Sequence, residues 1–146
     1  VARLSGLDGN AKMGKSMGNA IYLSDTPEAV WQMVRSAVTD PARITATTPG
    51  TPEICNVYKY HQVFNAGEAE EIGHLCREGK IGCVACKKRL NAVLNELLDP
   101  FREKRAYYEA HLDEVKELIA EGTRKANRIG NENLERIKEK MHIKVF

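Results

Sequence analysis

The sequence predicts a mostly α-helical protein, built as a helical bundle. Apolar residues recur at intervals of three and four along most of the chain, which is the spacing of one helix face. The five prolines lie at or before residue 100, and between residues 52 and 100 no proline interrupts the pattern. Alternating apolar and polar residues, the signature of a half-buried strand, are nearly absent, and only residues 20–23 carry a strand signal.

Each predicted helix has its own boundary signal. Thr26 before Pro27 is typical of a helix start, because a hydroxyl can cap the first turn and proline fits its first position. Apolar spacing predicts a second helix over 54–64, ended by residues 65–67, and a third over 68–77. Further predicted helices begin at Cys83, at Asp99–Pro100, near Leu112 and near Ala126. Gly122 is predicted to end the helix that begins near Leu112.

Composition and charge exclude several classes of protein. Of 146 residues, 42% are hydrophobic and 29% are charged, as in an ordinary globular protein rather than a disordered one. The net charge of +2 is too balanced to indicate nucleic-acid binding by itself. No apolar run of about 18 residues is present, so we expect no membrane partner. Residues 1–10 show no signal-peptide pattern, and we expect a cytoplasmic chain cut from a longer one.

Residues 6–19 form a loop suited to phosphate binding. It contains Gly6, Gly9, Gly14 and Gly18, together with Lys12, Lys15 and Ser16. Backbone N–H groups and the two ammonium groups could hold a polyphosphate, while a flexible surface loop is the alternative. Residues 9–16 also match the P-loop pattern G-x-x-x-x-G-K-[ST], but no strand–loop–helix context accompanies them, so we interpret this match as chance.

The loop and its flanks resemble a known family. Residues 12–16, Lys-Met-Gly-Lys-Ser, resemble the KMSKS signature of class I aminoacyl-tRNA synthetases. Residues 6–11, 18–21, 37–40 and 122–127 resemble the bacterial tryptophanyl-tRNA synthetases in particular. The resemblance covers essentially the whole chain as the C-terminal part of a longer enzyme. It implies that residues 1–45 are the C-terminal edge of a Rossmann-like catalytic domain and residues 46–146 a helical anticodon-binding domain.

This resemblance implies an activity and its residues. The family activates tryptophan with ATP and Mg²⁺ and transfers it to tRNA(Trp). Lys12 and Lys15 would be catalytic, stabilising the departing pyrophosphate, and would bind ATP together with Met13, Gly14 and Ser16. Gly14 replaces the usual serine, so fixing the loop in one conformation costs more conformational entropy.

Other features of the family are missing or lie elsewhere. The family's HIGH motif is absent from this sequence, so we expect the chain alone to be inactive. The family forms homodimers, and we expect their interface to lie mostly in the part of the enzyme outside this sequence. The alternatives are a free-standing metal-stabilised RNA-binding module without catalysis and, less favoured, an electron-transfer protein.

The four cysteines follow the pattern Cys55-x20-Cys76-x6-Cys83-x2-Cys86. Four thiolates from predicted helix ends could converge on zinc or on an iron–sulfur centre, or they could be unrelated buried thiols. A subset of the resembled synthetases bears C-x(about 22)-C-x6-C-x2-C and binds a 4Fe–4S cluster. That resemblance implies a 4Fe–4S cluster here, although the first gap is about two residues shorter. With four sulfurs available, His61 and His74 would be unnecessary as ligands.

A basic trio follows the last cysteine. Lys87, Lys88 and Arg89 could offset the negative charge of a thiolate-bound cluster or contact tRNA, and a solvated basic turn is the alternative. The resemblance favours contact with the tRNA anticodon, because the cluster in those enzymes lies near the anticodon site.

Overall fold

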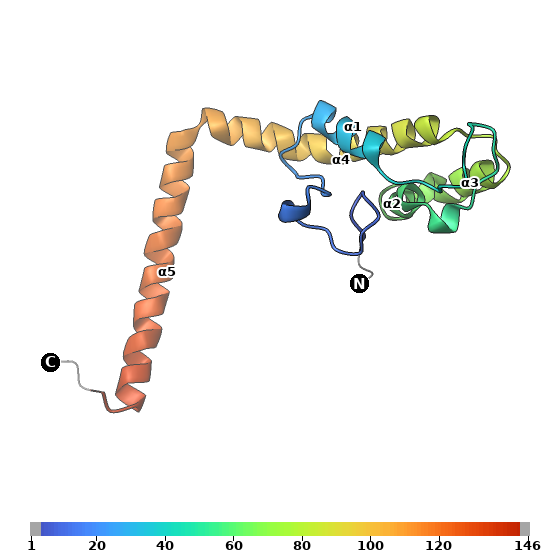
Figure 1. The fold of residues 1–146 in the computed structure, drawn as a ribbon. Helices are drawn as coiled ribbons and strands as arrows, with labels where there is room; N and C mark the ends of the chain where they lie inside the picture. Colours follow the sequence, from blue (N-terminus) through green and yellow to red (C-terminus); the bar gives the residue numbers. More distant parts are fainter. Residues whose placement is uncertain (1–3, 144–146) are drawn as a thin grey trace. The chain divides into compact units, whose positions relative to one another are not determined.

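The computed structural model describes residues 4–143 and is mostly helical there, as the sequence predicts (Figure 1). Its elements are the 3-10 turn η1 (Lys15–Met17), α1 (Pro27–Ser36), the 3-10 turn η2 (Pro52–Ile54), α2 (Asn56–Phe64), α3 (Ala66–Arg77), α4 (Cys83–Ala110) and α5 (Leu112–Lys140). The strand signal at residues 20–23 is wrong, because this stretch is irregular. None of the helices described is both long and apolar enough to cross a membrane.

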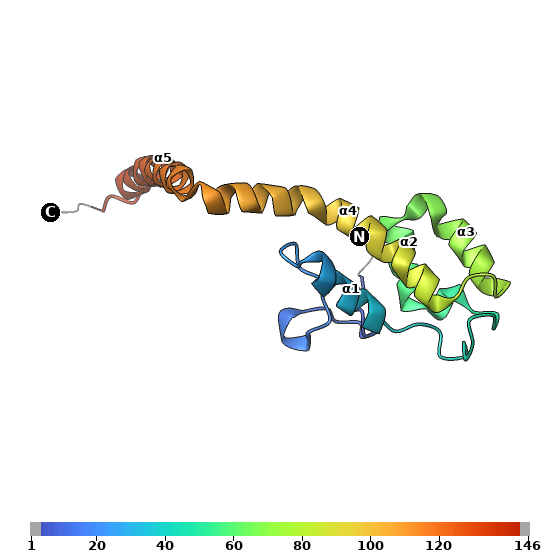
Figure 2. The ribbon, with the colours of Figure 1, turned by 90° about the horizontal axis from the view of Figure 1, so that it is seen from above.

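The chain divides into two compact units, Val1–Arg102 and Glu103–Phe146. The predicted domain boundary after residue 45 lies inside the first unit and stays a prediction. Side chains from both sides of that position share one hydrophobic core. Its buried members are Leu7, Val30, Val34, Ala37, Cys55, Val57, Tyr60, Leu90, Leu94 and Leu98. The first unit therefore packs α1, α2 and the beginning of α4 around a single interior (Figure 2).

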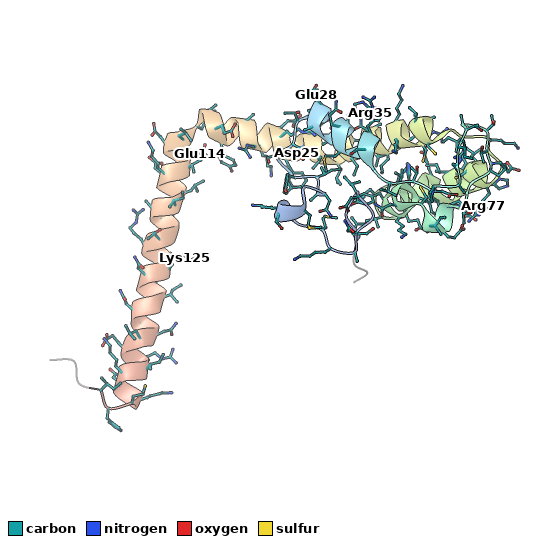
Figure 3. All side chains as sticks on the ribbon, viewed as in Figure 1. Asp25, Glu28, Arg35, Arg77, Glu114 and Lys125 are labelled. Carbon is teal, nitrogen blue, oxygen red and sulfur yellow. The ribbon has the colours of Figure 1, made fainter. Side chains whose placement is uncertain are left out.

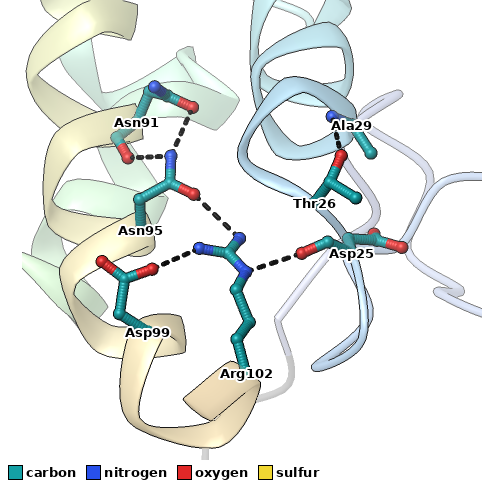
Figure 4. A network of polar contacts seen from close by, with 7 residues as sticks. All are labelled: Asp25, Thr26, Ala29, Asn91, Asn95, Asp99 and Arg102. Atoms are coloured by element: carbon teal, nitrogen blue, oxygen red, sulfur yellow. Dashed lines mark hydrogen bonds and ion pairs between the residues drawn. The ribbon is translucent and has the colours of Figure 1, made fainter. Parts of the chain in front are cut away.

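The predicted helix break at Pro100 is wrong, because α4 continues through it. A proline inside a helix removes one backbone hydrogen bond and costs about 3 kcal/mol. Side-chain contacts bridge the site: the Arg102 guanidinium donates to Asp99 Oδ1 (2.6 Å), Asn95 Oδ1 (2.8 Å) and the Asp25 carbonyl (2.8 Å), as Figure 4 shows. These bonds join residues on both sides of Pro100 and also tie α4 to the segment before α1.

In the second unit, α5 runs without interruption through Gly122, where the sequence predicts a helix end. Glycine costs about 1 kcal/mol relative to alanine in a helix interior, which weakens the helix but does not end it. A Cβ at Gly122 would meet no neighbouring atom, so packing does not require a glycine at this position. No residue of α5 is buried, and side chains such as Lys125 project from it (Figure 3).

Candidate functional site

The glycine-rich loop is closed at its base by backbone hydrogen bonds. The Leu7 N–H donates to the Asn19 carbonyl (3.0 Å), and the Leu7 carbonyl accepts from the Val38 N–H (2.9 Å). Leu7 itself is 2% exposed and belongs to the core. The segment from Leu7 to Asn19 is therefore a surface loop whose two ends are fixed side by side.

Helix α2 holds the chain that enters this loop. The buried Asn56 amide donates to the Gly6 carbonyl (2.7 Å), and the Tyr60 hydroxyl donates to the Ser5 carbonyl (2.8 Å). Burial, and to a lesser extent the charge of Asp8, raises the pKa of Tyr60 to about 12. The phenol therefore stays neutral at physiological pH and keeps its donor.

Asn19 fixes the middle of the loop from inside, a role that the sequence pattern does not reveal. Its side chain is 3% exposed, and its Nδ2 donates to Asp8 Oδ1 and to the Lys12 carbonyl, both at 2.9 Å. Its Oδ1 accepts the Gly14 N–H (3.1 Å). The hydrogen bond from Asn19 is the main cause that lowers the pKa of Asp8. The buried Asn19 amide thus holds the backbone in place on both sides of Met13.

The predicted phosphate-binding side chains lie on the outside of this framework. Lys12, Lys15 and Ser16 are exposed, whereas Met13 packs against the core. Gly14 has extended backbone (φ −178°), and a Cβ there would meet nothing within 4 Å. A serine would fit at this position. The loop therefore has a backbone held by hydrogen bonds and two solvent-exposed ammonium groups. This combination suits binding of a polyanionic ligand from solvent.

The structure brings the four cysteines together. Cys55 precedes α2, Cys76 lies in the last turn of α3, and Cys83 and Cys86 occupy the first turn of α4. All four thiols are free and line one small cavity, which Thr39, Asp40, Arg43 and Ile81 complete. Within residues 4–143, no three His, Cys, Asp or Glu side chains are arranged to hold a single metal ion.

The end of α3 determines where Cys76 lies. Gly79 has left-handed backbone (φ 67°), its N–H donates to the Cys76 carbonyl (3.1 Å), and the Lys80 N–H donates to the Leu75 carbonyl (2.8 Å). This pair of bonds is a Schellman motif, which ends a helix at a fixed residue. The Gly50 N–H donates to the same Cys76 carbonyl (3.0 Å), and a Cβ at Gly50 would come within 2.9 Å of the Cys76 Sγ.

Polar groups face the thiols on two sides. Arg43 donates to the Thr48 and Ala46 carbonyls, and its Nη1 lies 3.5 Å from the Cys76 Sγ. On the other side, the Nε2 of fully buried His61 lies 3.5 Å from the Cys86 Sγ. The sequence pattern does not reveal either contact: Arg43 lies 33 residues before Cys76, and His61, considered only as an unnecessary ligand, lies 25 residues before Cys86.

Burial makes this an unfavourable place for bare thiolates. It raises the pKa of Cys86 to about 12, with the neighbouring cysteines adding to the shift, and it raises the pKa of Cys76 despite the nearby Arg43 charge. The raised pKa values of Cys76 and Cys86 therefore favour the protonated form of these two thiols until something replaces their protons. A metal centre does so, because metal-bound cysteine is thiolate.

The three basic residues that follow Cys86 differ in their surroundings. The Lys87 ammonium donates to the Arg35 carbonyl (2.7 Å) in the last turn of α1, and burial lowers the pKa of Lys87. Lys88 and Arg89 are exposed. Lys87 therefore caps a helix, while the other two cations are available to a partner.

Comparisons with known proteins identify relatives of this chain. The sequence is similar to the tryptophan–tRNA ligases of Aquifex aeolicus (39% identity over 97% of this chain) and Deinococcus radiodurans (38% over 95%). The fold is similar to that of tryptophanyl-tRNA synthetase from Campylobacter jejuni in a crystal structure with ADP and tryptophan, with a TM-score of 0.86, 28% identity and 98% of this chain covered.

The chain spans less than half of each of these relatives: 36% and 42% of the two ligases and 44% of the C. jejuni chain. Residues 2–99 match the model of one family, the class I tRNA synthetases (W and Y). The glycine-rich loop and the four cysteines all lie within this range. On this basis, the chain belongs to the class I tRNA synthetases of the tryptophan and tyrosine family.

Proposed function

We propose that this chain is the part of a tryptophan–tRNA ligase that supplies the ATP phosphate-binding loop and the anticodon-binding helices. The named relatives are tryptophan–tRNA ligases that align along nearly all of it. The observation that carries the proposal is the loop from Leu7 to Asn19, which is closed at its base, pinned by Asn19, and presents Lys12 and Lys15 to solvent.

In the proposed reaction, the tryptophan carboxylate attacks the α-phosphorus of ATP. The bond to the β-phosphate breaks, and pyrophosphate leaves with the bonding electrons. Negative charge grows on the departing group, and the Lys12 and Lys15 ammonium groups stabilise it. Because Asn19 fixes the backbone at Lys12 and Gly14 beforehand, less of the loop has to be ordered when ATP and its Mg²⁺ bind.

A second candidate is an RNA-binding module without catalysis. The exposed cations Lys88 and Arg89 suit it equally well. The lysine loop favours the ligase, because a module that only binds RNA has no use for a pinned polyphosphate site.

The loop can be tested in the ligase that contains this chain. We expect Lys12→Ala and Lys15→Ala each to lower kcat for tryptophan-dependent ATP–pyrophosphate exchange by about 10²-fold, since each removes a charge that stabilises the transition state. The KM for tryptophan should change little.

Lys59→Ala, which removes an exposed lysine of α2, is the matched control. Gly14→Ser should keep or raise the rate, because the site has room for the side chain. Wild-type exchange rates in both loop variants would refute the catalytic role and favour the RNA-binding module.

We further propose that Cys55, Cys76, Cys83 and Cys86 hold a 4Fe–4S cluster. All four line one cavity. A cubane bridges four thiolates through its own iron and sulfide atoms. The cavity measures about 20 Å³, so the four side chains would have to move apart to admit the cluster. A single zinc ion would instead need sulfurs about 3.8 Å apart, given Zn–S bonds of about 2.3 Å in a tetrahedron.

The charges around the cavity also suit a cluster. Arg43 places a cation beside the Cys76 Sγ, and the start of α4 directs its partial positive charge toward Cys83 and Cys86. When bound, the cluster would supply a rigid connection between the ends of three helices.

We expect the chain purified without oxygen to be brown and to contain about four irons. Changing any one of the four cysteines to serine should lower the iron content and the visible absorption. Thr39→Val, which alters a cavity-lining residue without sulfur, should leave both unchanged. A colourless protein with one zinc per chain would overturn the cluster in favour of zinc.

For tRNA binding, we propose that Lys88 and Arg89 contact the anticodon loop of tRNA(Trp). Both are exposed at the start of α4, next to the cysteine cavity. Arg89 can stack on an unpaired base, and Lys88 can pair with a phosphate. Lys87 is a third candidate, although binding would require it to leave the Arg35 carbonyl.

We expect Lys88→Ala and Arg89→Ala to weaken binding of tRNA(Trp). The slope of log Kd against log salt concentration should fall by about 0.7 for each lost phosphate contact. The measurement is a filter-binding titration at several salt concentrations, with Lys116→Ala, an exposed lysine of α5, as control. Equal affinity for a tRNA with an altered anticodon would argue against recognition at this site.

A further inference from the structure

His61 lies on the inner face of α2, beside one of the proposed cluster ligands. It is 0% exposed, and its Nε2 lies 3.2 Å from the Cys86 carbonyl oxygen and 3.5 Å from the Cys86 Sγ. A ring nitrogen can donate or accept a proton, so the meaning of these distances depends on which nitrogen of the ring carries the hydrogen.

The neighbours of His61 determine that tautomer. Asn65 Nδ2 lies 3.1 Å from Glu68 Oε2 and 3.3 Å from His61 Nδ1. An ionised carboxylate only accepts hydrogen bonds, so the Asn65 atom that faces Glu68 is the NH₂ group. The same NH₂ group faces Nδ1, which must therefore accept. The hydrogen of the neutral ring is then on Nε2, within reach of both the Cys86 carbonyl oxygen (3.2 Å) and the Cys86 Sγ (3.5 Å), so the thiolate would share it with the carbonyl.

We propose that His61 is a positioning residue for the cluster, donating its Nε2–H to the Cys86 thiolate and stabilising the reduced state. This inference rests on the proposed cluster. A donor to a ligating sulfur stabilises negative charge there, and the reduced cluster carries one more negative charge than the oxidised one. The hydrogen bond therefore raises the reduction potential and also holds the Cys86 side chain toward the cavity.

The relay Glu68–Asn65–His61–Cys86 explains why a polar ring is buried among apolar side chains of the core. Burying an unpaired imidazole would be unfavourable, because its polar atoms would lose their hydrogen bonds to water. Here both ring nitrogens have partners. Arg43 contacts Cys76, so two of the four thiols have a side-chain donor nearby.

The test compares His61→Phe with His61→Gln in the 146-residue chain loaded with iron and sulfide under anaerobic conditions. Phenylalanine fills the space without a donor, and glutamine can place an amide N–H near the position of Nε2. The measurements are iron content and the cluster reduction potential, followed by the electron paramagnetic resonance signal of the reduced state.

We expect His61→Phe to keep its iron and to have a more negative potential than wild type, and His61→Gln to return toward the wild-type value. His74→Phe, at an exposed histidine that pairs with Glu78, is the control and should not change the potential. A potential in His61→Phe equal to that of wild type would overturn the role of His61.

A second measurement needs no substitution, in case the phenylalanine variant does not fold. Wild-type chain labelled with ¹⁵N at histidine alone should show a weak histidine ¹⁵N coupling to the reduced cluster and an exchangeable proton lost in D₂O. A wild-type cluster without either coupling would overturn the hydrogen bond and leave the cluster proposal intact. A wild-type chain that takes up no iron would overturn both.

Discussion

The structure depends above all on how four cysteines, one buried and three half-buried, gather where α2, α3 and α4 meet. Burial favours protonated thiols, as the raised pKa values of Cys76 and Cys86 indicate, whereas metal ligation requires thiolates. Three features of the fold could stabilise the thiolates of the proposed cluster. Arg43 contacts Cys76, the beginning of α4 holds Cys83 and Cys86, and His61 lies against Cys86. An empty cavity of thiols would gain little from these donors, but a bound cluster would gain from each.

Helix α2 connects the two candidate sites although it has only nine residues. On one side, Asn56 and Tyr60 hold the backbone that enters the lysine loop. On the other, Cys55 precedes the helix and His61 contacts Cys86. A change in the packing of α2 would therefore disturb both the glycine-rich loop and the cysteine cavity. This coupling is physical and local, since both sites are built on one hydrophobic core.

Periodicity in the sequence predicted the helices well, and local chemistry predicted their starts, as at Thr26 and Pro27. It failed at Pro100, where side-chain hydrogen bonds from Arg102 join both sides of the proline, and at Gly122, because a single glycine weakens a helix without ending it. Arg102 bridges the proline through partners as distant as Asp25, which no local pattern contains. The four cysteines could be grouped from spacing and family resemblance. Asn19, Arg43 and His61 could not, because their roles depend on contacts made only in the folded chain.

The central proposal is that the four cysteines together bind one cofactor. Mössbauer spectroscopy of the chain loaded with ⁵⁷Fe under anaerobic conditions tests this most directly, because it distinguishes a cubane from isolated iron. We predict that a single diamagnetic 4Fe–4S spectrum accounts for essentially all bound iron, at about four irons per chain. A spectrum of mononuclear or non-specifically bound iron, unchanged when Cys86 is replaced by serine, would contradict the account.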